Sequence, residues 1–209
     1  MKAYAYLNGS FETINKIIPS TEEQSIVIAV DGGLKHLDTL SIIPDVIIGD
    51  MDSVSSEMLS RYFKTSHIFT YPVEKDKTDA ELALDWCLDN NVKELIFVSS
   101  FDGRADQLMS HFILLRIAAT YGINAEIRSN SQRVLLMEYE TLLEVNIGDT
   151  VSLIPHSKEV TGVTTSGLKY PLKGETLFSE STRGISNVAI AKKVKISFTD
   201  GLLYVMVIN

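Results

Sequence analysis

The sequence predicts an α/β domain with a mostly parallel sheet, followed by an all-β, sandwich-like domain. Up to about residue 130, short apolar runs alternate with helix-like segments. After Arg133, short stretches rich in Val, Thr, Ile, Tyr and Phe are separated by frequent glycines and prolines. A chain of 209 residues can form one ordinary domain or two compact ones. Because the sequence pattern changes once along the chain, we predict two domains, 1–130 and 131–209.

The elements of the first domain follow from apolar runs and helical spacing. Apolar residues recur at helical spacing in segments 79–88 and 107–119, and Gly122 suits the end of the second helix. A shorter helix is expected at 57–63, where Ser53 or Ser55 could begin it. Six short apolar runs are the predicted strands: 3–7, 26–30, 46–48, 68–71, 95–98 and 125–127.

The second domain is predicted from its turn signals. Glycine and proline recur between short β-prone segments, which indicates an antiparallel sandwich or barrel. Asp200-Gly201 stands between the β-prone segments 194–198 and 202–207 and predicts a terminal hairpin. No linker rich in Pro, Gly or Ser separates the two halves, so we expect them to pack together.

Charge and cysteine content narrow the class of function. Nineteen Lys and Arg against 27 Asp and Glu give a net charge of -8, which argues against binding to nucleic acid or to an anionic membrane. A phosphate substrate would therefore need a cation. The one cysteine, Cys87, excludes an intramolecular disulfide, and no apolar run reaches the length of a membrane helix. We expect a cytoplasmic protein.

The aspartates are concentrated in one part of the chain. Eleven of 13 lie between residues 31 and 106, and Asp31, Asp50 and Asp102 each follow a predicted strand. The carboxyl ends of parallel strands form the edge at which ligands bind, so these side chains are expected to converge. Asp also favours turns and helix N-caps, which for any single residue is an equally good explanation.

The segment 49–53, Gly-Asp-Met-Asp-Ser, is more specific. In an extended chain, Asp50 and Asp52 would lie on the same face about 7 Å apart, close enough for both carboxylates to bind one hard cation. Mg²⁺ is the expected ion, because it takes one or two carboxylates together with water and phosphate oxygens. Capping of the next helix by a serine would explain one acid but not both.

Two further charged loops open helices. Thr78 and Glu81 fit a capping box, and Asp79 suits the helix dipole, which leaves Lys75 and Lys77 beside a helix N-terminus that can bind an anion. In segment 99–107 a strand end is followed by a glycine turn and a helix start. There Arg104 offers a planar fork for phosphate, and Asp106 is either a second carboxylate or an N-cap.

Other site types lack sequence support. The four histidines have no metal-ligand spacing, and we expect no zinc site. No Walker or dinucleotide-binding glycine loop occurs, and Asn8-Gly9 is interpreted as a turn. Nucleotide binding, if present, would use carboxylates and metal.

Taken in order, these motifs resemble the thiamin pyrophosphokinase (thiamin diphosphokinase) family. The matching segments are Asp31-Gly32-Gly33, Gly49 to Ser53, Glu74 to Asp79 with Glu81, Gly103 to Gln107, Gly167 to Leu172, Ser186-Asn187 and Asp200 to Leu203. Asp102, Gln107 and Val188 depart from the residues that are common in the family. The resemblance implies transfer of the diphosphate of ATP to the hydroxyethyl group of thiamin, with Mg²⁺, AMP as the second product, and a homodimer that forms the thiamin site.

The resemblance also implies roles for individual residues. Domain 1–130 would bind nucleotide and metal, and domain 131–209 would bind thiamin. The implied catalytic residues are Asp31, Asp50, Asp52, Asp79 and Asp106, of which Asp50, Asp52 and Asp79 would hold the metal. The implied ATP or substrate contacts are Lys75, Lys77, Thr78, Arg104 and Gln107, and the implied thiamin contacts are Ser186 and Asn187.

Two other hypotheses remain open at this point. One is a metal-dependent phosphotransferase that acts on a different alcohol, which the departure at Val188 would permit. The other is a non-catalytic module that binds thiamin or nucleotide. The second explains less, because a module without phosphoryl chemistry has little physical reason to keep so many acids together.

Overall fold

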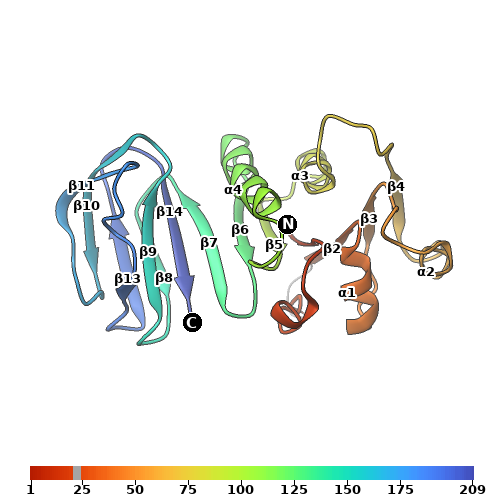
Figure 1. Cartoon of the computed structure of the whole chain (residues 1–209), viewed down its shortest axis with the longest axis horizontal. Coiled ribbons are helices and arrows are strands. Elements are labelled where there is room, and N and C mark those ends of the chain that lie inside the picture. Colours follow the sequence, from red (N-terminus) through yellow and green to blue (C-terminus); the bar gives the residue numbers. More distant parts are fainter. Residues whose placement is uncertain (21–24) are drawn as a thin grey trace. The chain divides into compact units, whose positions relative to one another are not determined.

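The structure is a computed structural model that describes residues 1–20 and 25–209. The chain divides into two compact units, Met1–Asn130 and Ser131–Asn209. Each unit is described by itself (Figure 1).

The first unit contains a parallel sheet of six strands. Every neighbouring pair in it is parallel, as the sequence predicts, and the order is β6-β5-β1-β2-β3-β4. Strands β1, β2, β3 and β5 are buried along most of their length, which agrees with their continuous apolar runs. The strands are β1 (Lys2–Tyr6), β2 (Ser25–Val30), β3 (Val46–Gly49), β4 (His67–Thr70), β5 (Glu94–Val98) and β6 (Asn124–Arg128).

The strand order creates a switch point. From β1 the chain runs outward through β2 and β3 to β4, then returns to the other side of β1 with β5 and β6. The loops that follow β1 and β5 therefore leave in opposite directions, and a crevice opens between the carboxyl ends of these two strands. Open parallel sheets bind ligands in such crevices.

The helices of the first unit begin where the sequence places polar caps. The predicted helices at 79–88 and 107–119 are confirmed as α3 (Asp79–Asp89) and α4 (Ala105–Thr120). Ser55 caps α2 (Ser56–Ser60), a shorter helix than the 57–63 expected, by accepting a hydrogen bond from the Met58 N–H at 3.2 Å. Helix α1 (Gly33–Leu40) and the 3₁₀ turn η1 (Phe11–Thr13) were not predicted. Among the described residues, no helix is both long enough and apolar enough to cross a bilayer.

The second unit is an antiparallel sandwich, not a barrel. One layer has the order β12-β9-β14-β7 and the other β11-β10-β13-β8. Buried aliphatic side chains from both layers form a single core, with Val151, Val163, Val194 and Val205 fully buried. The strands are β7 (Gln132–Met137), β8 (Thr141–Glu144), β9 (Thr150–Pro155), β10 (Glu159–Ser166), β11 (Lys173–Phe178), β12 (Asn187–Val188), β13 (Lys193–Ser197) and β14 (Leu203–Ile208).

The predicted terminal hairpin is wrong. Strand β13 pairs with β8 and β10, whereas β14 pairs with β7 and β9, so the two strands lie in opposite layers. Asp200-Gly201 turns the chain from one layer to the other, with Gly201 at φ 107°. Both strands direct apolar residues into the shared core, because Ile196 and Leu203 are each fully buried. An alternating pattern on both sides of a turn fits this crossing as well as it fits a hairpin.

Candidate active site

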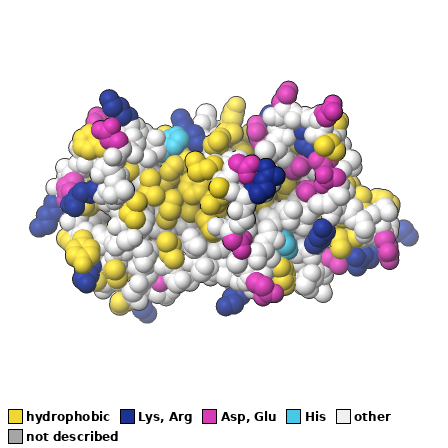
Figure 2. Space-filling view, viewed as in Figure 1, with side chains coloured by type: hydrophobic (Ala, Val, Ile, Leu, Met, Phe, Trp, Pro, Cys, Tyr) yellow, Lys and Arg dark blue, Asp and Glu magenta, His cyan; other side chains and the backbone are white. Residues whose placement is uncertain are grey.

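Three acids meet at the carboxyl edge of the parallel sheet. Asp31 follows β2 directly, and Asp50 and Asp52 follow β3, its neighbour in the sheet. One carboxylate oxygen from each of the three lies within 4.8 Å of the others. Figure 2 shows acidic side chains gathered over the region of α3 and β4. The convergence expected from the strand ends is therefore present for Asp31 and Asp50, whereas Asp102 is not part of this group and lines a separate hollow.

The backbone brings Asp50 and Asp52 together by a tight turn. Strand β3 ends at Gly49, Met51 has φ 63°, and the Asp52 N–H donates to Asp50 Oδ1 at 3.2 Å. The expectation of an extended segment with both acids on one face is wrong. A short side chain that hydrogen-bonds the backbone two residues on favours a turn over an extended chain.

The surroundings of Asp31 suit the binding of a cation. Its Oδ2 accepts a hydrogen bond from the Ser53 hydroxyl at 2.7 Å, so Ser53 serves the acid and not a helix cap. Its Oδ1 is buried and has no hydrogen-bond partner among the described residues. A buried carboxylate oxygen without a partner is costly unless a cation binds it. With Asp50 and Asp52 beside it, this hard oxygen set fits a divalent cation such as Mg²⁺.

Lys75 joins this group to α3. Its ammonium lies 3.1 Å from Asp50, 3.1 Å from Asp79 and 3.0 Å from the carbonyl oxygen of Pro72. The three charged side chains are at most about one-fifth exposed. Asp79 thus contacts Lys75, and the acids whose oxygens come together are Asp31, Asp50 and Asp52. Asp79 as a metal ligand stays a prediction.

The pKa shifts describe one coupled electrostatic group. The hydrogen bond from the Asp52 N–H, together with Lys75, lowers the pKa of Asp50. The negative charge of Asp50 in turn raises the pKa of Asp52. Burial raises the pKa of Asp79, although Lys75 opposes the shift. Burial alone would lower the pKa of Lys75, but its bonds to Asp79 and Asp50 raise it overall. A cation placed here would relieve the repulsion between the acids.

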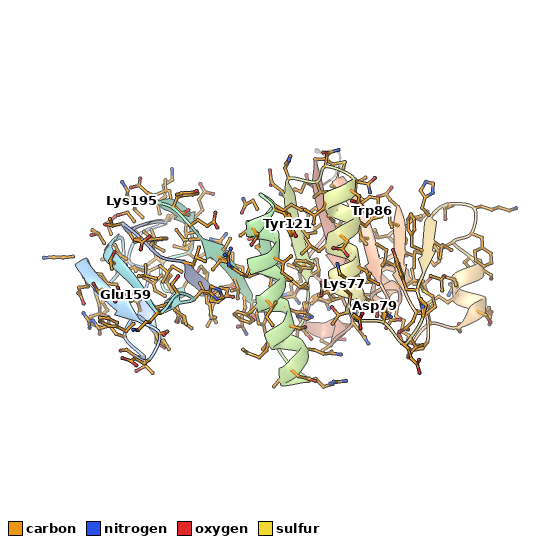
Figure 3. All side chains as sticks on the ribbon, turned by 90° about the horizontal axis from the view of Figure 1, so that it is seen from above. Lys77, Asp79, Trp86, Tyr121, Glu159 and Lys195 are labelled. Carbon is orange, nitrogen blue, oxygen red and sulfur yellow. The ribbon has the colours of Figure 1, made fainter. Side chains whose placement is uncertain are left out.

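The start of α3 has the predicted Thr78 cap, but the Glu81 carboxylate of the expected capping box pairs with Lys77. Thr78 Oγ1 accepts a hydrogen bond from the Glu81 N–H at 3.2 Å. The Glu81 carboxylate pairs with Lys77 at 3.6 Å, and Lys77 also binds Asp85 at 2.6 Å. Figure 3 shows Lys77 and Asp79 at the same end of α3, with Trp86 further along the helix. The charged groups therefore surround a helix N-terminus.

The third predicted group forms an ion pair of its own at the start of α4. Arg104, at the N-cap position of α4, holds Asp106 through Nε at 3.1 Å and Nη2 at 2.6 Å. Asp106 Oδ1 also accepts from the Gln107 N–H at 2.9 Å. Asp106 therefore serves neither as the N-cap nor as a member of the group formed by Asp31, Asp50 and Asp52. Arg104 and Asp106 are both exposed, so a ligand can reach them.

Two neighbouring hollows lie along this edge. The α3 hollow, of about 290 Å³, is lined by Asp50, Lys75, Lys77, Thr78 and Asp79 among others. The switch-point hollow, of about 300 Å³, lies where the loops after β1 and β5 separate. The residues that line it and not the α3 hollow are Gly9, Ser10, Ser99, Ser100, Asp102, Gly103, Arg104 and Leu108. Asn8, Gln107 and His111 line both hollows.

Several of these lining residues were not assigned from the sequence. Asn8-Gly9 was interpreted only as a turn, although it follows β1 and the strand-end rule used for the aspartates applies to it equally. A Cβ added to Gly9 would lie 2.3 Å from the Ser100 hydroxyl oxygen, so this glycine allows the two loops to approach closely. His111 carried no signal, because its position depends on how α4 packs.

In the second unit the two predicted thiamin contacts, Ser186 and Asn187, differ in exposure and in side-chain hydrogen bonding. Ser186 is exposed, has φ 62°, and donates its N–H to Ser152 Oγ at 3.0 Å. Asn187 is buried, and its amide is bonded to the Tyr170 backbone, with Oδ1 accepting from N–H at 3.0 Å and Nδ2 donating to O at 2.7 Å. Asn187 therefore fixes the segment that carries Tyr170, whose ring is exposed.

Comparison with known proteins agrees with this geometry. The family model described as thiamin pyrophosphokinase, catalytic domain, matches residues 19–128, and the model described as thiamin pyrophosphokinase, vitamin B1 binding domain, matches residues 139–203. The chain is 31% identical over 187 residues to a thiamine pyrophosphokinase of Bacillus subtilis, covering 88% of this chain and 87% of that protein. The chain belongs to the thiamin pyrophosphokinase family.

Solved structures from the family share the whole fold. A crystal structure of thiamine pyrophosphokinase from Bacillus subtilis has a TM-score of 0.89 at 27% identity and covers 100% of this chain and 99% of that one. One from Geobacillus thermodenitrificans has a TM-score of 0.85 at 26% identity, with 100% and 98% covered. In this thiamin pyrophosphokinase family member the five predicted acids fall within the catalytic match, and Ser186 and Asn187 fall within the vitamin B1 binding match.

Proposed function

We propose that the chain transfers the diphosphate group of ATP to the hydroxyethyl oxygen of thiamin, with Mg²⁺, and that residues 1–130 carry the chemistry. The observation that carries this proposal is the group of Asp31, Asp50 and Asp52, with an unpartnered buried oxygen, beside a hollow at the N-terminus of α3 that contains two lysines. Acids alone would repel a triphosphate. Acids beside lysines, at a sheet edge that fits a divalent cation, can bind it.

Asp31, Asp50 and Asp52 would hold the metal ion, with Asp79 at its side through Lys75. When bound, Mg²⁺ neutralises phosphate charge and polarises the phosphorus that is attacked. The proposed ligand set differs from the set Asp50, Asp52 and Asp79 that the resemblance implies, because Asp31 supplies the third nearby oxygen. Asp79 then acts mainly on the position and charge of Lys75.

The cationic side chains would bind the triphosphate. Lys75 and Lys77 line the α3 hollow, and the N-terminus of α3 adds backbone dipoles that favour an anion. Thr78 both caps this helix and lines the same hollow. Arg104 and Gln107 line the switch-point hollow, where Asp106 orients the Arg104 guanidinium for contact with the nucleotide.

The reaction is a single displacement at the β-phosphorus of ATP. The thiamin hydroxyl oxygen forms a bond to the β-phosphorus, and the bond from that phosphorus to the oxygen that bridges to the α-phosphorus breaks. AMP leaves with the electron pair of that bond, and an acid of the group accepts the alcohol proton. The β- and γ-phosphates therefore move together, and ADP is not an intermediate.

The thiamin site is assigned to the second unit. Ser186 is exposed and can contact the substrate, whereas Asn187 acts by holding the Tyr170 segment. Exposed apolar side chains lie beside these residues, at Ile185 and Ile190, and a second copy of the chain would cover them in the proposed homodimer. A cytoplasmic, reducing location belongs to the same proposal and is supported by Cys87, a buried free thiol.

The test is turnover with purified protein, ATP, Mg²⁺ and a panel of alcohols. The proposal expects thiamin to be converted to thiamin diphosphate with equimolar AMP, and other pyrimidine alcohols and nucleosides to react far more slowly. Release of AMP with another alcohol but not with thiamin would show that the acceptor substrate is that alcohol and not thiamin. Absence of turnover with every acceptor, despite nucleotide binding, would favour a binding module instead. Light scattering of the same sample tests the dimer.

A further inference from the structure

His111 stands at the boundary between the two hollows. It lies in α4, its side chain is about nine-tenths buried, and it is one of three residues that line both hollows. The other two are Asn8 and Gln107. A ligand that extends from the α3 hollow into the switch-point hollow must pass these three residues, and among them His111 alone is held inside the fold.

One ring nitrogen of His111, Nδ1, lies beside the Ser99 hydroxyl. The Ser99 hydroxyl has one proton, which it donates to the carbonyl oxygen of Ser100 at 3.2 Å. Ser99 Oγ also lies 3.3 Å from His111 Nδ1. If the hydroxyl proton stays on the Ser100 carbonyl oxygen, this contact is made by an N–H on Nδ1 that donates to the hydroxyl oxygen. In that tautomer the remaining nitrogen, Nε2, carries the lone pair and can accept a hydrogen bond.

The ring is neutral at ordinary pH. Burial lowers the pKa of His111 to about 4, so Nε2 remains a hydrogen-bond acceptor throughout the range in which enzymes are assayed. A neutral acceptor does not attract phosphate oxygens, which are themselves acceptors. It matches a hydroxyl group or an amino group.

The two hollows differ in the chemistry that they offer. The α3 hollow holds the ammonium groups of Lys75 and Lys77 and the acids Asp50 and Asp79, which suits phosphates and a cation. The switch-point hollow is lined by serine hydroxyl groups, two side-chain amides and glycine backbone, which can hydrogen-bond a nucleoside, together with Asp102, Arg104 and Leu108. In a nucleotide the sugar separates the phosphates from the base. The sugar therefore falls at the boundary where His111 lies.

We propose that Nε2 of His111 accepts a hydrogen bond from one ribose hydroxyl of ATP, the 2′ or the 3′, and makes the site selective for nucleotides that carry this hydroxyl. The inference rests on the proposed function, in which ATP is the donor substrate, and adds the residue that recognises its sugar. His111 contacts the part of ATP that leaves as AMP and takes no part in the transfer of the diphosphate.

The test is a cycle that combines two changes, one in the protein and one in the ligand. The affinities of AMP, 2′-deoxy-AMP and 3′-deoxy-AMP are measured by calorimetry, with Mg²⁺ and without thiamin, for the wild type and for His111→Phe. The wild type is expected to bind one deoxy form about five- to tenfold more weakly than AMP, the range of one neutral hydrogen bond. His111→Phe is expected to bind AMP and that deoxy form equally.

Three controls separate recognition from structure. His111→Gln keeps a neutral acceptor and is expected to restore most of the preference for AMP. Inorganic tripolyphosphate, which has no sugar, is expected to bind His111→Phe as it binds the wild type. His36→Phe replaces another buried histidine of the same unit, which lines neither hollow, and is expected to keep the wild-type preference.

The outcomes distinguish this inference from the proposed function. If thiamin diphosphate forms but His111→Phe discriminates against the deoxy nucleotides as the wild type does, the inference is wrong and the proposed function stands. If the preference depends on His111 while thiamin is not a substrate, the acceptor is wrong and the inference stands. If neither AMP nor ATP binds the wild type, both are overturned.

Discussion

Removal of the His111 imidazole should change how the stability of the first unit depends on pH. The pKa of His111 falls from the usual 6.5 to about 4 in the folded chain, so the unfolded state binds a proton that the folded state rejects. The stabilisation by neutral His111 is therefore fully present above about pH 6.5 and is lost as the pH falls through 4. Integration between pH 7.5 and pH 5.0 gives a loss of about 2 kcal/mol for this one group.

The assay is urea unfolding followed by the fluorescence of Trp86. This is the only tryptophan of the sequence and lies in α3, so the signal reports on the same unit as His111. Between pH 7.5 and pH 5.0, wild type should lose about 2 kcal/mol more than His111→Phe. His67→Gln, which removes an exposed histidine of the same unit, should behave as the wild type. Equal losses in wild type and His111→Phe would refute the account of a buried neutral imidazole.

Three further changes test other parts of the structure. Asp52→Asn and Asp79→Asn should each lower turnover about 100-fold or more without a change in the urea midpoint. The control Asp89→Asn, at the exposed end of α3, should keep activity. Near-normal rates in both site variants would show that the acids are wrongly assigned. The Cys87 thiol, whose pKa burial raises to about 12, should resist a disulfide reagent at pH 8 until urea unfolds the chain, and rapid native labelling would contradict its burial. Gly33→Ala should lower the free energy of unfolding in urea by about 1–3 kcal/mol, because its Cβ would lie 1.9 Å from the Tyr6 carbonyl oxygen. Glu57→Ala, at an exposed position in α2, should lower it far less. Equal stability of the two variants would argue against this close approach.

The fold was largely predictable because its signals are local. Apolar runs and capping residues lie next to the elements that they define, and Thr78 caps α3 as its sequence position predicts. Helix α1 escaped prediction because it has eight residues and begins at a glycine. The hairpin between β13 and β14 was predicted wrongly, because the residues beside Asp200-Gly201 do not specify whether the two strands pair within one layer or lie in opposite layers.

The site was predictable where single side chains follow strands and less so where packing decides. Asp31 and Asp50 were placed at the sheet edge from their positions alone, and they meet there. The turn at Met51 and the link from Lys75 to Asp79 depend on backbone geometry and side-chain direction, which alternation along a strand does not describe. His111 comes between two hollows only when α4 packs beside the loops after β1 and β5.

The most direct test of the central claim follows each phosphate of ATP to its product. In separate reactions with Mg²⁺ and thiamin, the ATP carries ³²P in its α- or its γ-phosphate. A diphosphate transfer predicts that γ-label appears only in thiamin diphosphate and α-label only in AMP, in equal amounts from the first turnover. Appearance of γ-label in thiamin monophosphate, with α-label in ADP, would contradict the account.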